Sequence, residues 1–342
     1  MPVTKKVQRA ERYPIARSPF SMRPTQREVA RLLGESRDNL RRLVNYKEQF
    51  VQRRDLEING KLRHLAYPES RLRSAHERLK FHLNKIQQPA YLFSPRRGKS
   101  QRDNAALHLE QVQYLTLDLK QFYPSTTSAM VRRWFINDLG MYQDVAGLMT
   151  HLVTIDDKVS FGSPLTPVLC TMVHRRMFDQ IADICRARGL NMSLWVDDLT
   201  ISGQFVTREV LREVRTVVRA FGLKTHKIKY RTGNRPVFIT GIGVVGSNLV
   251  APAKMNLKIK AAWEAYHAAQ TDAERDACAQ HLLTLLGTVR HIARRGSPLA
   301  RRVADQMNSL RQKRAVLTVT TTTRSAQAGA ALIANDAVGD PF

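Results

Sequence analysis

Cysteine is scarce in this chain, and long apolar runs are absent. Three cysteines occur in 342 residues, Cys170, Cys185 and Cys278, and none forms a C-x-x-C pair. They cannot all pair within one chain, which suits a reducing compartment and argues against a cysteine-based zinc site. No run of about 18 uncharged apolar residues could span a membrane, and residues 1–14 lack the apolar stretch of a secretory signal. We therefore expect a cytoplasmic protein without a membrane partner.

Acidic residues are also few compared with basic ones. The chain has 29 Asp and Glu against 55 Lys and Arg, which gives a formal net charge of +26 and a pI near 10.6. Its apolar fraction of 43% is close to the globular average, so wholesale disorder is excluded. A folded protein with this charge is expected to bind a polyanion, and nucleic acid is the first candidate.

The central part of the chain, residues 112–245, has the element order β-α-β-β-α-β. Strands are expected over residues 112–119, 193–196 and 199–202, and a strand pair broken by Gly241 and Gly243 over residues 237–245. Helices are expected over residues 125–139, 166–187 and 207–221. This order predicts an antiparallel sheet backed by helices, which is the α+β ferredoxin-like arrangement.

Helical segments flank this central part on both sides. The N-terminal arm has two helical stretches separated by Gly34, then a hairpin with an Asn59-Gly60 turn, then a helix over residues 70–86. Residues 254–314 are helical and basic. From Thr318 onward the chain is rich in Thr, Ala and Gly, and we expect this tail to be loosely ordered.

The strongest chemical signal is a set of carboxylates at strand ends. Asp118 ends the first central strand, and Asp197-Asp198 lies between two short strands. Two metal ions about 3.5–4 Å apart need hard oxygen ligands from separate strands, one ion to activate an attacking hydroxyl and one to hold a leaving pyrophosphate. An Asp-Asp pair by itself is an ordinary turn former, and the flanks of Asp156-Asp157 predict a plain hairpin turn. The segments around the carboxylates therefore decide the interpretation.

Three segments resemble, in the same order, the palm motifs of bacterial reverse transcriptases. They are Leu117-Asp118-Leu119-Lys120-Gln121-Phe122-Tyr123-Pro124-Ser125, then Gly162-Ser163-Pro164-Leu165-Thr166-Pro167, similar to G-x-P-x-S-P, and Trp195-Val196-Asp197-Asp198, similar to Y-x-D-D. Upstream, Arg63 to Pro68 with Leu72 resembles the fingers signature R-x-I-x-x-P-x-x-x-L. Together with Lys227 and a downstream Ile239-Thr240-Gly241, the motifs span about half of the chain.

Two motifs are similar to those of the retron branch of this family. Asn104-Ala105-Ala106-Leu107-His108 matches N-A-x-x-H, and Ile239-Thr240-Gly241 is close to V-T-G. Three residues depart from the family pattern: Phe161 replaces Gln, Thr166 replaces Ser and Trp195 replaces Tyr. None is a predicted metal ligand, so we expect the chemistry to be retained. The departures bear on template seating, nucleotide choice and fidelity, and they favour a divergent, defence-associated branch.

The resemblance implies a right-hand polymerase fold with a ferredoxin-like palm. Its expected parts are an N-terminal arm with fingers over residues 1–110, a palm over 111–252, a helical basic thumb over 253–314 and a tail over 315–342. Asp118, Asp197 and Asp198, with the Leu119 carbonyl, would hold two Mg²⁺ ions. Tyr123 would lie under the incoming sugar and disfavour a 2′-hydroxyl, and a core aromatic is the alternative.

Basic side chains are implied to bind the nucleotide and the nucleic acid. Arg63 and Arg97, with Lys99 as a further candidate, would grip the triphosphate, because guanidinium groups bind phosphate oxygens bidentately. Lys227 would lie near the leaving pyrophosphate. A solvated surface is the alternative for Arg97, and a contact with backbone phosphate is the alternative for Lys227.

The retron motif and the thumb are implied to contact RNA. Asn104 and His108 are four residues apart, so they share a helix face, and they would hold the structured RNA or brace the fold around it. Basic thumb residues, among them Arg294 and Arg295, would follow the duplex backbone, with binding that weakens steeply as salt rises.

The resemblance implies RNA-templated DNA synthesis from dNTPs. A retron enzyme copies part of its own structured noncoding RNA, primes from a 2′-hydroxyl of that RNA, and yields a branched RNA–DNA product (msDNA) that stays bound. The complex usually guards a separate effector protein in antiphage defence, and a higher-order complex is one form it could take. Two alternatives stay open: a defence-associated polymerase that uses protein priming or no conventional template, and an RNA-binding scaffold with a vestigial site. All three acidic positions are kept, which speaks against the scaffold.

Overall fold

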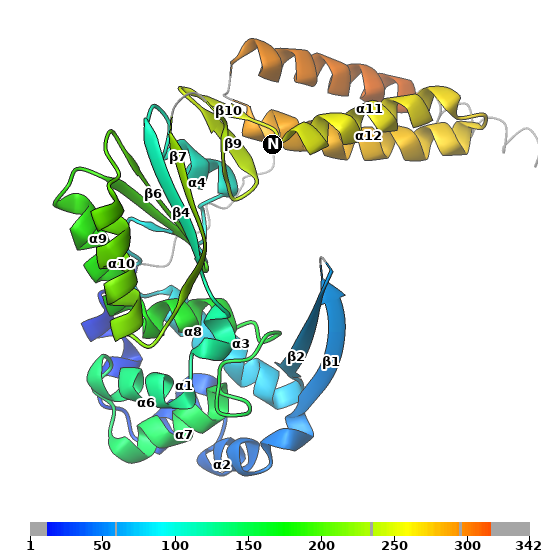
Figure 1. The fold of residues 1–342 in the computed structure, drawn as a ribbon. Helices are drawn as coiled ribbons and strands as arrows, with labels where there is room; N and C mark the ends of the chain where they lie inside the picture. Colours follow the sequence, from blue (N-terminus) through cyan, green and yellow to red (C-terminus); the bar gives the residue numbers. More distant parts are fainter. Residues whose placement is uncertain (1–11, 59, 233–234, 294–295, 316–342) are drawn as a thin grey trace, which may run out of the picture. The chain divides into compact units, whose positions relative to one another are not determined.

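The computed structural model describes residues 12–58, 60–232, 235–293 and 296–315 (Figure 1). Its internal contacts divide the chain into two compact units. The first unit comprises Met1–Ser100 and Gln111–Gly233, and the second comprises Gln101–Glu110 and Asn234–Phe342. The short segment 101–110 therefore groups with the C-terminal part of the chain, while the predicted functional boundaries at residues 110 and 252 stay predictions.

A five-stranded sheet with the order β3-β5-β6-β4-β7 forms the centre of the first unit. Its strands are β3 (Leu92–Ser94), β4 (Gln113–Leu119), β5 (Asn191–Trp195), β6 (Asp198–Gly203) and β7 (Thr225–Thr232). The pairs among β4, β5, β6 and β7 are antiparallel, and β3 adds a short parallel edge beside β5. These four antiparallel strands, with helices between β4 and β5 and between β6 and β7, confirm the predicted α+β, ferredoxin-like arrangement.

The last strand of this sheet differs from the prediction. The element order predicts residues 237–245 as its last strand, but the edge position is taken by β7. The predicted pair instead forms β8 (Val237–Ile239) and β9 (Ile242–Val245) in the second unit, with β10 (Asn248–Val250). The reason is that β7 is an edge strand whose mostly polar side chains alternate between half-buried and exposed positions, so it lacks a strong apolar pattern.

Two helices, α9 (Arg175–Arg186) and α10 (Arg208–Ala220), lie side by side and cover one face of this sheet (Figure 1). Their buried residues, such as Ile181 and Val214, join those of the strands in the main hydrophobic core. α10 begins after Thr207, whose side chain accepts a hydrogen bond from the Val210 N–H, and Gly222 follows its end with a φ of +78°. This helix and its glycine cap are as predicted.

The single helix predicted over residues 166–187 is in fact two helices. It divides at His174 into α8 (Thr166–Val173) and α9. His174 has φ −99° and ψ 12°, and its buried Nε2 lies 3.0 Å from Thr126 Oγ1. The backbone leaves helical geometry at the same residue whose ring makes this buried contact. Apolar periodicity does not reveal such a short break.

The other elements of the first unit are helices, short 3-10 turns and one hairpin. Those labelled in Figure 1, among them α1, α2, α6 and α7, are drawn below the sheet. These other elements are the short 3-10 turns Ile15–Arg17, Pro19–Ser21 and Lys47–Phe50, the helices α1 (Gln26–Leu33), α2 (Arg37–Asn45), α3 (Ser70–Asn84), α5 (Phe122–Ser125), α6 (Ser128–Asn137) and α7 (Gln143–Val153), and the hairpin of β1 (Val51–Ile58) and β2 (Lys61–Pro68). Gly34 ends α1 with a φ of +77°, and Ile58 pairs with Lys61 across the predicted turn. The helix predicted over residues 125–139 corresponds to α6, which begins at Ser128 and ends at Asn137, while Ser125 ends the short α5.

The second unit combines a three-stranded sheet, ordered β10-β9-β8, with helices. The helices are α4 (Gln101–Ala106), α11 (Ala253–Ala268), α12 (Asp272–Ile292) and a further helix over residues 298–315. Leu282, Leu286 and Leu310 belong to its own apolar core. Within the described ranges, no helix is both long and apolar enough to cross a membrane. The predicted loosely ordered tail lies, from residue 316 onward, outside the described residues.

Candidate active site

The three predicted acidic residues meet at one end of the five-stranded sheet. Asp118 lies near the end of β4, Asp198 opens β6, and the strand register places the two opposite each other. Asp197 lies in the turn between β5 and β6, where its carbonyl accepts a 2.9 Å hydrogen bond from the Leu119 N–H. Carboxylates that are far apart in the sequence therefore meet at one end of the sheet, and we call the group Asp118, Asp197 and Asp198 the carboxylate edge. Their metal-binding role stays a prediction.

The turn that presents Asp197 has an unusual backbone. Val196 has a φ of +61°, a left-handed conformation that β-branched residues rarely adopt. Because Trp195 pairs with Asp198, only two residues connect the strands, and tight hairpin turns of this length require a positive φ. Outliers of this kind cost about 1–3 kcal/mol and cluster at functional sites. The surrounding sheet therefore offsets a local strain that holds Asp197 at the edge.

Crowding of the carboxylates shifts their pKa values. Burial, together with the hydrogen bond to Asp118, raises the pKa of Asp198 to about 8. Burial and the nearby charge of Asp118 raise the pKa of Asp197. Burial also acts to raise the pKa of Asp118, but hydrogen bonds with Asp198 and Lys227 lower it overall. In the chain by itself, these shifts favour an ionised Asp118 beside a protonated Asp198.

A β-bulge in β7 aims Lys227 at the carboxylates. Between the pairs Thr116–Lys229 and Asp118–His226, β7 contains one residue more than β4, and Lys227 has a φ of +51°. The Lys227 ammonium forms an ion pair with Asp118, and His226 Nε2 lies 3.9 Å from the same carboxylate oxygen. A predicted nucleotide-binding residue and a predicted metal ligand are thus in direct contact.

The donor set at this edge fits a hard divalent cation. Carboxylate oxygens are the ligands that such ions prefer. Burial, then the neighbouring carboxylates, raise the pKa of Asp198, and a bound cation would favour its ionised form. Among the described residues, no three His, Cys, Asp or Glu side chains already converge as a closed group of ligands. Lys227 supplies the positive charge beside Asp118 instead. A cation at Asp118 requires this side chain to move, and its 54% exposure gives it room.

The carboxylate edge opens into a cavity of about 1020 Å³. Its lining includes Leu119, Tyr123 and Asp197, with Arg63 from β2 and Lys227 from β7. The volume is in the range of sites for small molecules and cofactors. Three of the four predicted nucleotide-binding residues therefore face one space together with two predicted metal-site residues.

Arg97 is not among the residues that line this cavity. It lies exposed in the loop after β3. The nearby Lys99 ammonium lies 5.1 Å from the centroid of the Phe93 ring, so this candidate also has a local contact. The triphosphate role that the sequence assigns to Arg97 stays a prediction without a place in the cavity.

Several basic groups that the sequence does not indicate also line the cavity. Lys120, Lys158 and His226 are among its lining residues, as is Arg53, which pairs with Glu48 and Asp156. Lys158 is brought there by the Asp156-Asp157 turn, which forms the plain hairpin that the sequence predicts. The sequence signals for these groups are the basic residues next to Asp118 and those in that hairpin. The spacing between the two segments does not indicate that they share a site.

Asn104 and His108 are buried in the second unit. Asn104 lies on α4, which packs against β8, β9 and β10, and its Nδ2 lies 3.4 Å from Thr240 Oγ1. Thr240 and Gly241 form the turn between β8 and β9 and both have a positive φ. Burial lowers the pKa of His108 to about 3, so the ring is neutral. The two motifs similar to retron enzymes thus contact each other, which favours the bracing role over direct contact with RNA.

Basic side chains of the predicted thumb remain on the surface. Exposed examples in the second unit are Lys254, Lys258, Lys260, Arg290, Arg301, Arg302, Arg311 and Lys313. Arg314 instead forms a two-atom contact with Asp276, at 2.6 and 3.0 Å. Arg294 and Arg295 lie outside the described residues.

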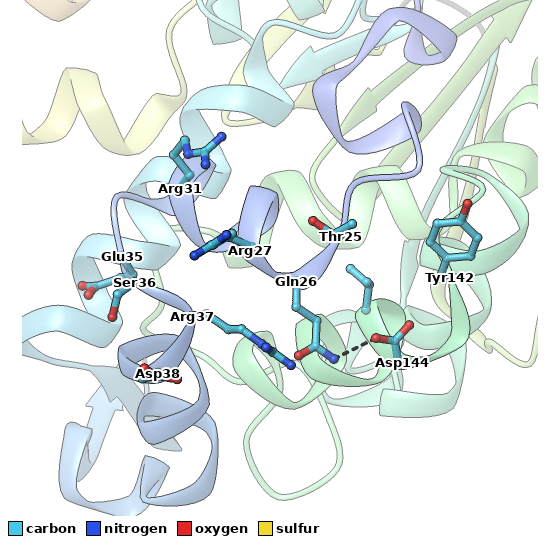
Figure 2. A pocket seen from close by; sticks show the side chains of 11 residues that line it. Thr25, Gln26, Arg27, Arg31, Glu35, Ser36, Arg37, Asp38, Tyr142 and Asp144 are labelled. Carbon is cyan, nitrogen blue, oxygen red and sulfur yellow. Dashed lines mark hydrogen bonds between the residues drawn. The ribbon is translucent and has the colours of Figure 1, made fainter.

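A second pocket, of about 730 Å³, lies between α1, α2 and the start of α7 (Figure 2). Three arginines and three carboxylates line it, and Gln26 Nε2 donates a 2.8 Å hydrogen bond to Asp144 Oδ2. Its charges therefore balance. None of the residues selected from the sequence lines this pocket, so the candidate site is the cavity beside Asp197.

Comparisons with known proteins agree with the motifs. Residues 47–244, more than half of the chain, match the family described as reverse transcriptase (RNA-dependent DNA polymerase). The retron Mx65 reverse transcriptase of Myxococcus xanthus is 30% identical over 245 residues, which are 62% of this chain and 55% of that protein. The retron Se72 reverse transcriptase of Salmonella heidelberg (strain 579083-10) is 28% identical over 145 residues, 42% of this chain and 38% of that protein. The chain spans about half, or less, of the length of these curated relatives.

Among solved structures, an apo telomerase from Candida Tropicalis, truncated from its C-terminal domain, is similar with a TM-score of 0.45 and 10% identity. The likeness covers 64% of this chain and 61% of that chain, and it is too weak to identify the fold by itself. The fold is identified instead by the family match and by the carboxylate edge, where the matched motifs meet. This chain belongs to the reverse transcriptase family, as a divergent member similar to the retron enzymes.

Proposed function

We propose that this chain is an RNA-directed DNA polymerase whose nucleotide site is the cavity beside Asp197. The observation that carries the proposal is the composition of that cavity. It joins Asp197, from the acidic edge, an aromatic wall at Tyr123 and cationic side chains at Arg63 and Lys227 in one space of nucleotide size. A triphosphate, a sugar and a metal-dependent transfer step each need one of these features.

Each residue has a proposed task in that site. Reverse transcriptases use divalent metal ions, and we propose two Mg²⁺ ions held by Asp118, Asp197, Asp198 and the Leu119 carbonyl. When bound, they would activate the attacking hydroxyl and neutralise the leaving pyrophosphate. Lys227 would leave Asp118 and follow the pyrophosphate. Burial raises the pKa of the Tyr123 phenol, so this side chain stays neutral as a wall under the sugar.

We further propose that the template is a structured noncoding RNA and that the product is branched msDNA. Similarity to retron reverse transcriptases supports this, as does the contact between Asn104 and Thr240, which links the two retron-like motifs. The Asn104 and His108 side chains are both buried, so we propose that they shape a surface for the RNA. The high positive charge supports RNA and DNA as the bound polyanions.

Defence against phage, a separate effector protein, a higher-order complex and a cytoplasmic location complete the proposal. They follow from the retron-like motifs and from cysteines that suit a reducing compartment. Among the described residues, Cys170, Cys185 and Cys278 all carry unpaired thiols.

The test is to sequence the nucleic acid that co-purifies with the protein and to assay primer extension on an annealed RNA template. Branched DNA of one defined sequence, joined to RNA, is the expected result. Homopolymer or random DNA would support protein-primed or untemplated synthesis, and RNA alone would support a scaffold. An Asp118→Asn variant is the matched control, because it keeps the side-chain shape and removes one charged ligand.

A further inference from the structure

Phe161 stands where the family pattern has Gln, and its ring lies between two residues of the proposed nucleotide site. The Arg63 guanidinium carbon is 5.0 Å from the centroid of the ring. The Tyr123 ring meets it edge to face, with centroids 5.2 Å apart and an interplanar angle of 64°. All three side chains line the cavity of about 1020 Å³.

The backbone that carries this ring is hydrogen-bonded to β2 of the β1–β2 hairpin. The Ala66 N–H donates a 3.1 Å hydrogen bond to the Phe161 carbonyl, and Ser160 Oγ donates a 2.7 Å hydrogen bond to the Ala66 carbonyl. Leu65 of β2 forms a parallel bridge with Phe161. The segment that carries the ring is therefore attached to the same strand that carries Arg63.

The residue after Phe161 is constrained as well. Gly162 has a φ of +107°, and a Cβ at this position would come within 2.8 Å of Tyr67 Cβ. A side chain here would meet both backbone strain and a clash. The backbone directly after Phe161 therefore has little freedom to move, which keeps the segment that carries the ring in place.

We propose that Phe161 is a positioning residue that sets the distance between the triphosphate grip of Arg63 and the sugar gate of Tyr123. Its face attracts the guanidinium and its neighbour Tyr123 packs against it, so one ring orders both ends of the nucleotide. The inference rests on the proposed polymerase function and deepens it. Phe161 thereby contributes to the choice of deoxynucleoside over ribonucleoside triphosphates.

The test compares the wild-type chain, Phe161→Leu, Phe161→Tyr and the control Phe81→Leu in primer extension, with separate dNTP and rNTP titrations. Phe161→Leu keeps most of the apolar volume but removes the ring, and Phe161→Tyr keeps the ring. Loss of a cation–π contact and an edge-to-face contact should raise the KM for dNTP in Phe161→Leu by about three- to thirtyfold, with kcat changed less than about threefold. The ratio of rNTP to dNTP use should rise about three- to tenfold in the same variant. Phe161→Tyr should restore both values to within about twofold.

Phe81→Leu is the matched control. Phe81 lies exposed on α3, outside the cavity, and also carries a cation over its ring, Lys85 Nζ at 4.2 Å from the centroid. The same chemical change there should leave KM and nucleotide choice unaltered.

Four outcomes would overturn the inference. Equal KM values in Phe161→Leu and Phe161→Tyr would do so, as would a fall in kcat with KM unchanged, because a ring that merely stabilises the fold alters the amount of active enzyme and not its KM for dNTP. Failure of the wild-type chain to extend any primer with dNTPs would overturn both the inference and the polymerase function. An active wild type with unaltered variants would overturn the inference alone.

Discussion

His76 provides a sharp test of how the region behind the cavity is held together. Its buried ring places Nδ1 2.8 Å from Ser163 Oγ and Nε2 2.9 Å from the Leu152 carbonyl. A carbonyl can only accept, so Nε2 carries the proton and Nδ1 accepts from the Ser163 hydroxyl. The neutral ring satisfies both neighbours, whereas protonation of Nδ1 would leave the Ser163 hydroxyl without its acceptor. Burial, partly offset by the hydrogen bond to Leu152, lowers the pKa of His76 to about 4.

This shift makes the stability of the first unit depend on pH. An unfolded histidine takes up a proton near pH 6.5, but His76 in the folded chain does so only near pH 4. Between these values the unfolded state binds one proton more, so the free energy of unfolding falls as the pH falls. The contribution is complete above pH 6.5 and lost by about pH 4. Its slope is about 1.4 kcal/mol per pH unit, and its total is about 3 kcal/mol.

The measurement compares the parent chain with His76→Gln, which keeps a donor and an acceptor but does not titrate. Both are made with Trp263→Phe, so that Trp134 and Trp195 report urea unfolding of the first unit. Free energies of unfolding at pH 7, 6 and 5 should fall less steeply in the variant, by roughly 1 kcal/mol per pH unit. Other histidines and carboxylates titrate equally in both proteins. Parallel slopes would refute the buried, neutral state of His76.

Further predictions concern the site itself. Changing Asp197 and Asp198 together to Ala should abolish DNA synthesis on a primed RNA template while RNA affinity, measured by filter binding, stays within about twofold, because ligands for metal and not for phosphate are lost; normal dNTP incorporation would contradict the assignment. Tyr123→Val should raise the ratio of rNTP to dNTP incorporation by removing the wall under the sugar, and an unchanged ratio in an active variant would return Tyr123 to the core. Asn104→Ala with His108→Ala should spare extension of a supplied primer but reduce synthesis begun on the bound RNA by about ten- to a hundredfold, since the contact of Asn104 with Thr240 in the β8–β9 turn and the buried His108 ring are lost; equal losses in both assays, on protein shown to be folded by thermal melting, would indicate a general structural role.

Local patterns sufficed for much of the fold. The Asn-Gly signal located the β1–β2 hairpin, Gly222 marked the end of α10, and Asp118 was correctly placed at the end of a buried strand. These features depend on residues close in sequence, so a local pattern contains the information. The break at His174 was missed because apolar periodicity runs through it, and the buried contact of His174 is with a partner 48 residues away.

Residues of the candidate site also divide into those that local sequence identifies and those that depend on distant partners. Arg63 and Arg97 both lie in basic segments and both were predicted to grip phosphate, but only Arg63 lines the cavity. Its strand is joined to the segment that carries Phe161, and no residue near Arg63 in the sequence indicates that pairing. The buried state of Asn104 was equally hidden, because its partner Thr240 is 136 residues away.

The sequence alone determined which acids and motifs the chain carries and in what order, and this was enough to predict the family and the acidic edge. Only the tertiary structure decided which side chains surround that edge. A one-residue bulge in β7 turns Lys227 toward Asp118, and a parallel bridge brings Phe161 between Arg63 and Tyr123. The physical reason is that strand register and inter-strand bridges are set by packing over the whole unit, and a shift of one residue changes which side chain faces the site.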